Sequence, residues 1–474
     1  MEYLGSTWIR NRRERLSVKQ RPLVLVAVVL VCAGLAWLVQ DLAKPTVQGD
    51  GVGLYAPLAS LLIDHDLDFR NEFAHSGRSV RQRWLTGPDG RIVNPYPIGA
   101  AILWTPAVVT AWLLDPKRTS YGDPTRWVGI SPAYTRRYFI ALAIGTAIEA
   151  LLGLWLVYRL VRARVRRRHA LLAVAACALG TPLLFYAVAM PSYAHAASFL
   201  ICAAFLSVAL SPREDRRSLM YLGLLWGLLT IVRYQDAVLG VIAAPRLWRE
   251  LRNSGRHARR ETGLRIGLFV LPAVLVFLPQ YLYWKDVYGE ALVTAVPILM
   301  NWTRPHFLGF LFSTWQGAIL WSPVIALGII GLRWVENRSL RWALWSGILL
   351  EIYVCAATGD WWGSASCGAR RLVVIAPLVG LGLGLGLERG FERRVVFLQP
   401  RARMIVRYAV VVLALLWNLR LTQYYAQGLL PMNPGNPYDY LRDYSPRDPR
   451  SRPWGLWDYG RFAAEIAAAE RRMW

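Results

Sequence analysis

The chain has 474 residues, of which 55% are hydrophobic and 18% are charged, and its formal net charge is +25. This apolar content and the mean hydropathy of +0.30 exclude an ordinary soluble domain and a disordered chain, and they predict a membrane protein. The basic residues cluster in short runs between apolar segments, which is typical of membrane topology rather than of nucleic-acid binding, and the five cysteines form no Cys-x-x-Cys pair that would indicate a thiolate metal site.

The first apolar run, 22–40, follows six basic residues and precedes no Ala-x-Ala cleavage pattern. It therefore predicts an uncleaved anchor with a cytoplasmic N-terminus. Further basic clusters each follow an apolar segment, and we place all of them in the cytoplasm; they lie at 162–168, 213–217, 246–265, 333–341 and 389–407. The spans predicted between them lie near 137–160, 170–190, 196–210, 219–232, 235–248, 266–284, 317–333, 342–358, 372–387 and 408–423.

These elements predict an all-α fold, a polytopic transmembrane helical bundle of about 11–12 spans. Residues 1–423 would form the bundle, with a long first outer loop at 41–97 that carries juxtamembrane helices, and 424–474 would form an outer tail. We expect a multi-pass protein of the cell inner membrane with most of its unusual polar residues on the periplasmic side.

Segment 98–114 is apolar enough to span the membrane. A full crossing there would place the basic cluster 162–168 outside, against the positive-inside rule. We therefore expect a helix that dips into the outer leaflet or lies on it, and the full span stays open as the alternative.

The first outer loop opens with Asp50 between glycines, directly after the predicted anchor. A carboxylate at this point can meet a substrate arriving from either phase, so Asp50 is the candidate general base. The alternative is that Asp50 caps a helix starting near Val52. The acidic residues of 64–68 alternate like a calcium loop but lack its glycine and glutamate, and we predict no metal ligands.

Two polar positions interrupt later apolar segments. His195 begins a predicted helix at the outer surface, where its ring could hydrogen-bond a sugar or a phosphate, although a lone histidine at a helix end is more often structural. Arg233 lies at the outward tip of a two-helix hairpin, and an ionisable group in such apolar sequence is a functional candidate. An internal ion pair between Arg233 and Asp236 is the alternative.

A cluster of aromatic and basic residues lies in the outer loop 359–371. The adjacent Arg370 and Arg371 are predicted on the outer side, against the positive-inside bias, and their guanidinium groups suit a lipid phosphate. Trp361 and Trp362 suit stacking on a sugar face. Anchoring of these residues in the membrane interface is the alternative.

Together, these features resemble the GT-C superfamily of integral-membrane glycosyltransferases, particularly the branch of protein O-mannosyltransferases and the lipid A aminoarabinose transferase. The resemblance covers roughly 50–377. The segments that carry it are the Asp50 loop, Tyr96-Pro97-Ile98-Gly99, the Pro191 to His195 turn, the Arg233 hairpin, Gln280-Tyr281 to Tyr288-Gly289, and Leu311-Phe312-Ser313 leading into Trp321-Ser322-Pro323. The chain departs from that branch at Asn94-Pro95, where a basic residue precedes a proline pair in the family.

The resemblance implies inverting transfer of a sugar from a polyprenyl-phosphate donor to a hydroxyl of a lipid, glycan or protein acceptor. Asp50 would be the base. Tyr55, Tyr96, His195 and the tryptophan and arginine residues named above would bind the donor. The phosphate needs no acid catalyst if cations offset its charge, so no cofactor is expected and a divalent metal is possible but not required.

Two other functions remain open. A transporter or flippase for lipid-linked sugars would also need an aromatic and basic cavity in a helical bundle. Such a protein typically shows inverted repeats and a site at the midplane, whereas this chain shows no repeat and places its polar residues on one face. A membrane glycan polymerase differs from the predicted transferase only in its acceptor. Membrane lipids are expected partners, and nucleic acid is not.

Overall fold

The computed structural model describes residues 47, 49–69, 72–73, 92, 94, 96–116, 132–213, 215–253, 259–288, 300–363, 366–390, 399–426 and 430. Every regular element in these ranges is helical, and the described residues in β-bridges are Ile92 and the isolated pair Met300 and Thr358. The all-α prediction is therefore confirmed. The predicted anchor at 22–40 and almost all of the predicted tail at 424–474 lie outside the described residues.

The helices of the described ranges follow one another along the chain with no β-strand between them. In chain order they are α2 (Asp50–Ala59), η2 (Ser60–Asp64), α4 (Gly99–Leu113), η5 (Pro132–Tyr134), α5 (Arg136–Arg162), α6 (Arg167–Leu179), α7 (Leu183–Val188), α8 (His195–Ala209), α9 (Arg216–Val232), η6 (Tyr234–Ala243), α10 (Ala244–Asn253), α11 (Arg259–Tyr288), α12 (Phe307–Phe312), α13 (Ala318–Trp321), α14 (Val324–Gly331), η7 (Leu332–Trp334), α15 (Arg338–Ala357), η8 (Arg370–Ile375), α16 (Ala376–Arg389) and α17 (Pro400–Ala426).

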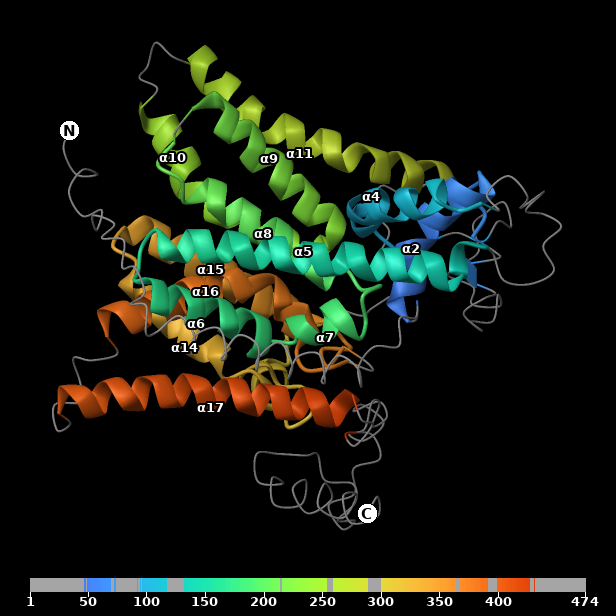
Figure 1. Cartoon of the computed structure of the whole chain (residues 1–474). Helices are drawn as coiled ribbons and strands as arrows, with labels where there is room; N and C mark the ends of the chain where they lie inside the picture. Colours follow the sequence, from blue (N-terminus) through green and yellow to red (C-terminus); the bar gives the residue numbers. More distant parts are fainter. Residues whose placement is uncertain are drawn as a thin grey trace, which may run out of the picture.

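The long helices pack side by side as a bundle, which Figure 1 shows from the side. Five stretches of the described chain are long and apolar enough to cross a membrane: Arg136–Arg162, Glu261–Asp286, Arg338–Ala357, Arg370–Arg389 and Ile405–Ala426. Shorter apolar helices, including α4 and α8, lie among them. The chain is a multi-pass membrane protein.

Several of the predicted spans correspond to single α-helices, but four are built from more than one helical segment; 317–333 is divided into α13, α14 and η7, and 372–387 starts as η8 and continues as α16. The predicted span 170–190 is divided into α6 and α7, because Gly180, Thr181 and Pro182 interrupt the helix. The predicted span 235–248 starts as the 3₁₀ segment η6 and continues as α10. The segment predicted at 98–114 is the 15-residue α4, shorter than the roughly 20 residues that an upright spanning helix needs.

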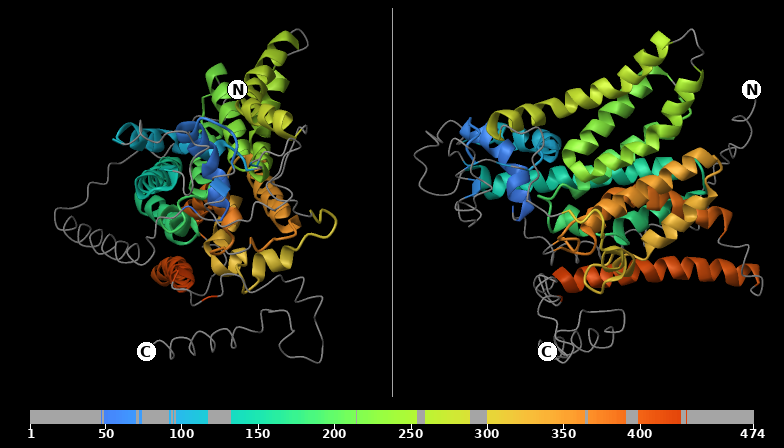
Figure 2. Two further views of the ribbon diagram at one scale, coloured as in Figure 1. Left: turned by 90° about the vertical axis from the view of Figure 1, so that its right-hand side faces the viewer. Right: turned by 180° about the vertical axis from the view of Figure 1, so that it is seen from behind.

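The alternating direction of the helices gathers the basic clusters at one end of the bundle. The C-terminal ends of α5, α8, α10 and α16 lie toward the left in Figure 1. Helices α2, α4 and α7 lie toward the opposite end, seen from two further directions in Figure 2. The segments carrying the predicted site residues therefore meet at the end away from the basic clusters.

Helix α16 lies at the centre of the bundle, and 94% of its spanning window is buried. Its glycine row permits close contact with both neighbours: a Cβ on Gly382 would overlap the Gly328 carbonyl of α14, and one on Gly380 would lie 2.7 Å from the Cys177 Sγ of α6. These glycines pack helices together, as expected for small residues inside a membrane bundle.

Candidate active site

Asp50 is the first residue of α2. The residue at the cap position is Gly49, whose φ of 58° lies in the left-handed region that favours glycine. The Asp50 carboxylate accepts hydrogen bonds from Arg370 Nη2 at 2.8 Å and from Tyr96 Oη at 3.3 Å. Gly49 and not Asp50 thus occupies the cap position, and the 37% exposed carboxylate is held between an arginine and a tyrosine.

The glycines around Asp50 allow two other segments to reach it. A Cβ on Gly49 would overlap the Tyr193 hydroxyl, and a Cβ on Gly51 would overlap the Ser192 side chain. On the next turn, a Cβ on Gly53 would overlap the Tyr96 ring. The alternating glycines therefore bring the turn before α8 and the segment before α4 into direct contact with α2.

Asn94 holds the segment before α4 in place. Its side-chain amide donates to the Gly53 carbonyl at 2.6 Å, and its backbone amide donates to Tyr283 Oη at 3.0 Å on α11. Further along, the Ile98 amide donates to Gln280 Oε1 at 2.8 Å. Asn94, where the chain departs from the expected pattern, therefore fixes the position of this segment. This position allows the Tyr96 hydroxyl to donate to Asp50.

Arg370 and Arg371 open η8, and both guanidinium groups are almost buried. Arg370 pairs with Asp50, and its Cζ lies 5.0 Å above the Tyr193 ring, a cation–π distance. Arg371 Nη2 donates to Asp360 Oδ1 at 2.7 Å, and its Nη1 donates to Thr358 Oγ1 at 2.9 Å. Each of these arginines therefore has its own carboxylate.

Arg233 follows the last residue of α9, where the backbone becomes extended. Its Nη1 lies 3.3 Å from His195 Nδ1 and donates to the Arg371 carbonyl at 3.2 Å. Among the described residues it has no carboxylate within 4.0 Å, and Asp236 accepts a hydrogen bond from Ser198 Oγ at 2.7 Å. The described residues therefore show no direct Arg233–Asp236 ion pair, although Asp236 and Glu351 interact with Arg233 electrostatically at longer range.

These side chains line a cavity of about 450 Å³. Six of the predicted residues meet there, and the lining includes Asp50, Tyr96, His195, Arg233, Arg370 and Arg371. Asp360 pairs with Arg371 beside it, so three guanidinium groups face two carboxylates. Arg233 is the guanidinium of this lining without a carboxylate in direct contact among the described residues, so it is the group best placed to contact an anionic ligand.

Three predicted residues, Tyr55, Trp361 and Trp362, are not among those that line this cavity. Tyr55 is 0% exposed, because its ring packs edge-on against Tyr134 and its hydroxyl donates to the Ala133 carbonyl at 3.0 Å. Trp361 stacks on His306 and Trp362 stacks on Trp315, with ring centroids 6.4 and 5.8 Å apart. The two tryptophans form an aromatic wall outside the cavity lining.

Several lining residues were not among those predicted from the sequence, notably Tyr193, Gln235, Trp302 and Thr358. Tyr193 lies in the same turn as His195, so the turn was recognised from the sequence but the role of Tyr193, whose hydroxyl lies against Gly49, was not. Burial raises the pKa of the Tyr193 phenol, and the nearby Arg370 opposes that effect in part. The phenol is therefore a neutral hydrogen-bonding group beside the Asp50–Arg370 pair.

Gln235 was overlooked because only the tertiary fold shows its partner. Its side-chain amide donates to Glu351 Oε1 at 2.8 Å and to Cys355 Sγ at 3.3 Å, both on α15. With the nitrogen held by α15, the planar amide turns its carbonyl oxygen away from that helix. In the described ranges, no group of three or more His, Cys, Asp or Glu side chains is arranged to hold a metal ion.

No family model matches the chain, and no curated protein sequence matches it. The fold is similar to the apo oligosaccharyltransferase of Archaeoglobus fulgidus, with a TM-score of 0.49, 13% identity, and coverage of 93% of this chain and 63% of that chain. The chain thus spans less than two thirds of that protein's length. It is also similar to ArnT from Cupriavidus metallidurans bound to undecaprenyl phosphate, with a TM-score of 0.46, 13% identity, and coverage of 85% and 74%.

Proposed function

We propose that this protein is an inverting glycosyltransferase that moves a sugar from a polyprenyl-phosphate donor to an acceptor hydroxyl. The observation that carries the proposal is the meeting of the Asp50 carboxylate with Arg233, Arg370 and Arg371 in one cavity of the bundle. The lining includes residues at the start of α2, α8 and η8 and at the end of α9, which are the opposite helix ends from those that carry the basic clusters, so the positive-inside rule supports a periplasmic or exterior active site.

The acceptor hydroxyl attacks the anomeric carbon from the face opposite the phosphate. As the new carbon–oxygen bond forms, the bond to the phosphate oxygen breaks and its electron pair leaves with the lipid phosphate. Asp50 takes the hydroxyl proton, which fits its position at the start of α2 with 37% of its side chain exposed. Tyr96 and Arg370 fix the orientation of the carboxylate.

The charges of Arg233, Arg370 and Asp50 match the changes in charge that occur during this reaction. The donor is a phosphodiester with one negative charge, which Arg233 can offset, since it has no carboxylate partner among the described residues. Transfer converts the donor into a phosphomonoester, which can carry a second negative charge. When Asp50 takes up a proton, Arg370 loses its counter-charge and becomes available to that second charge. The sum of charges in the cavity therefore stays constant through the transfer.

We propose that this chemistry needs no obligatory cofactor. Guanidinium groups at Arg233 and Arg370 can supply the charge stabilisation that a divalent metal gives to phosphate leaving groups elsewhere. Chelation with EDTA during the transfer assay tests this directly. Loss of turnover that returns on adding Mg²⁺ or Mn²⁺ would contradict the proposal.

The experiment compares wild type with Asp50→Asn in nanodiscs. Radiolabelled polyprenyl-phosphate hexoses and pentoses serve as donors, with host membranes as the source of acceptor. Asparagine preserves the shape and an acceptor for Tyr96 and Arg370, but it is not a base. We expect turnover to fall by at least about 100-fold, while undecaprenyl phosphate, the lipid present in the ArnT structure, still binds.

Wild-type turnover in Asp50→Asn would remove Asp50 as the base. The transporter alternative predicts a different result. In proteoliposomes, a flippase would move a fluorescent polyprenyl-phosphate sugar across the bilayer without releasing free polyprenyl phosphate, and the Asp50→Asn variant would do so as well.

A further inference from the structure

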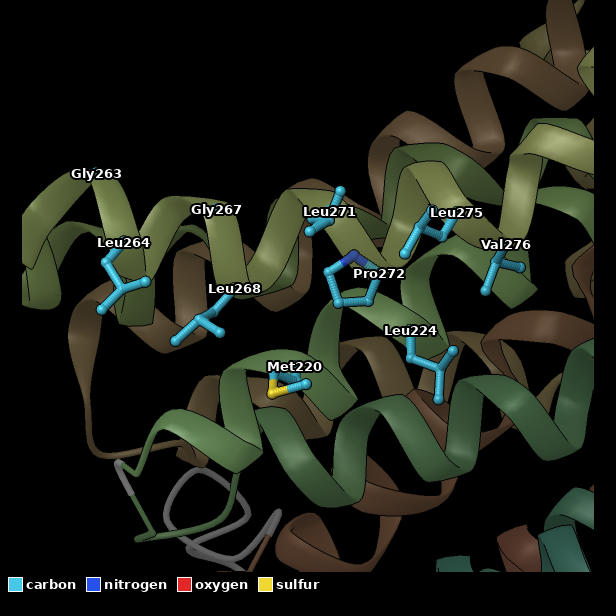
Figure 3. A pocket seen from close by; sticks show the side chains of 10 residues that line it. All are labelled: Met220, Leu224, Gly263, Leu264, Gly267, Leu268, Leu271, Pro272, Leu275 and Val276. Carbon is cyan, nitrogen blue, oxygen red and sulfur yellow. The ribbon is translucent and has the colours of Figure 1, made fainter.

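A second hollow lies far from the candidate active site, between α9 and α11. It encloses about 640 Å³, and Figure 3 shows the side chains that line it. All of the lining residues are apolar or glycine: Met220 and Leu224 come from α9, and Gly263, Leu264, Gly267, Leu268, Leu271, Pro272, Leu275 and Val276 come from α11. Only 11% of the spanning window of α11 is buried, so this helix faces the membrane along most of its length. The hollow is therefore a groove open to lipid.

The glycines of the two helices differ in what surrounds them. On α9, a Cβ on Gly223 would overlap the Phe269 carbonyl, and one on Gly227 would lie 2.7 Å from Ala273 Cα. The packing of α9 against α11 therefore requires those glycines. On α11, a Cβ on Gly263 or Gly267 would meet nothing within 4 Å. Glycine lowers helix stability relative to alanine, and no contact within the described chain accounts for these two.

One end of the groove is strongly basic. Arg216 and Arg217 lie four and three residues before Met220, so they share its side of α9 one turn beyond the lining. Arg216 contacts Glu261 at 3.1 Å, and exposed Arg217 has no acidic partner among the described residues. The described charged side chains at the start of α9, in α10 and at the start of α11 are the acids Asp215, Glu250 and Glu261 and the arginines Arg213, Arg216, Arg217, Arg246, Arg249, Arg252 and Arg265.

We propose that this groove is a binding site for an anionic phospholipid, with an acyl chain against Gly263 and Gly267 and the phosphate at Arg216 and Arg217. The two glycines let a hydrocarbon chain approach the helix backbone, and the arginines give the head group its charge selectivity. A second copy of this chain fits the groove less well, because a two-fold contact here would bring the two arginine-rich ends close together.

The probe is phosphatidylglycerol, compared with phosphatidylcholine of the same acyl chains, and the readout is lipid retention by the full-length protein in native mass spectrometry. We expect one phosphatidylglycerol to be retained at least about tenfold more tightly than phosphatidylcholine. Gly267→Leu should weaken it about tenfold, because leucine fills the groove without a clash. Arg217→Ala should weaken it about fivefold through loss of one basic contact.

Two matched variants serve as controls. Val270→Leu enlarges an exposed residue of α11 outside the groove lining, and Arg338→Ala removes an exposed arginine at the start of α15. Both should retain phosphatidylglycerol within twofold of wild type. Equal retention of the two lipids would overturn the proposal, as would unchanged retention in Gly267→Leu. A dimer that Gly267→Leu converts to monomer would also overturn it, because a second copy would then be the occupant.

Discussion

Arg233 offers the sharpest test of the proposed phosphate contact, because it lacks a carboxylate partner among the described residues. The guanidinium reaches the cavity from the end of α9, held by His195 and the Arg371 carbonyl. Truncating one partner of a buried, hydrogen-bonded charge pair costs about 2–5 kcal/mol. Arg233 is only half-buried, so we expect the lower part of that range, about 2–3 kcal/mol for Arg233→Ala. That loss corresponds to roughly 30- to 150-fold weaker binding.

The assay is titration of undecaprenyl phosphate into the protein in nanodiscs, with the uncharged polyprenol as the reference ligand. Arg233→Lys should lie between wild type and Arg233→Ala, because lysine keeps the charge but loses the planar fork. Arg420→Ala is the matched control, since Arg420 is exposed on α17 and outside the cavity lining. Binding to Arg233→Ala within threefold of wild type, or equal binding of the polyprenol, would refute the reasoning.

Three further predictions concern the packing of α2, the pH dependence of stability and the membrane topology. Gly51→Ala should lower stability by about 1–3 kcal/mol and reduce transfer, because the new Cβ overlaps the Ser192 side chain, and an unchanged apparent melting temperature would contradict this. Burial raises the pKa of Glu72 to about 10, above its unfolded value of about 4.3. The protonated Glu72 carboxyl therefore contributes its full stabilisation below the unfolded pKa, and this stabilisation is lost as the pH rises toward 10. Between pH 5 and 9, the apparent melting temperature should depend on pH less in Glu72→Gln than in wild type. For topology, in a background without native cysteines, an impermeant thiol reagent on intact cells should label Thr303→Cys and spare Ala163→Cys, and the reverse pattern would invert the orientation.

The bundle could be predicted from the sequence because each span is an apolar run bounded by arginines. Where the prediction was imperfect, backbone chemistry within an apolar run decided the outcome. The run at 170–190 reads as one span by hydropathy, yet Gly180 and Pro182 end one helix and begin the next. Hydropathy measures transfer to lipid and carries no information on such breaks. The anchor at 22–40 stays a prediction.

The site was harder, because composition identifies groups but not their partners. Asp50 and Arg370 are 320 positions apart, and no local pattern shows that they form an ion pair. The aromatic residues were misplaced for a related reason: a tryptophan in an outer loop suits a sugar face and an aromatic wall equally well, and only packing distinguishes them. Tyr55 was assigned to the substrate because it follows Asp50 in the motif, but on α2 it faces Tyr134 and the core.

The three arginines of the cavity illustrate what tertiary contacts add to a sequence pattern. From the sequence, Arg233, Arg370 and Arg371 are equivalent candidates for a lipid phosphate. In the fold, Asp50 neutralises Arg370 and Asp360 neutralises Arg371, while Arg233 contacts a histidine and a carbonyl. The same substitution should therefore have three different effects. Loss of Arg233 should weaken the ground-state contact with the phosphodiester. Loss of Arg370 should reduce stabilisation of the transition state, in which Asp50 gains its proton. Loss of Arg371 should leave Asp360 unpaired and disturb the backbone segment that carries Arg370 and that contacts Arg233.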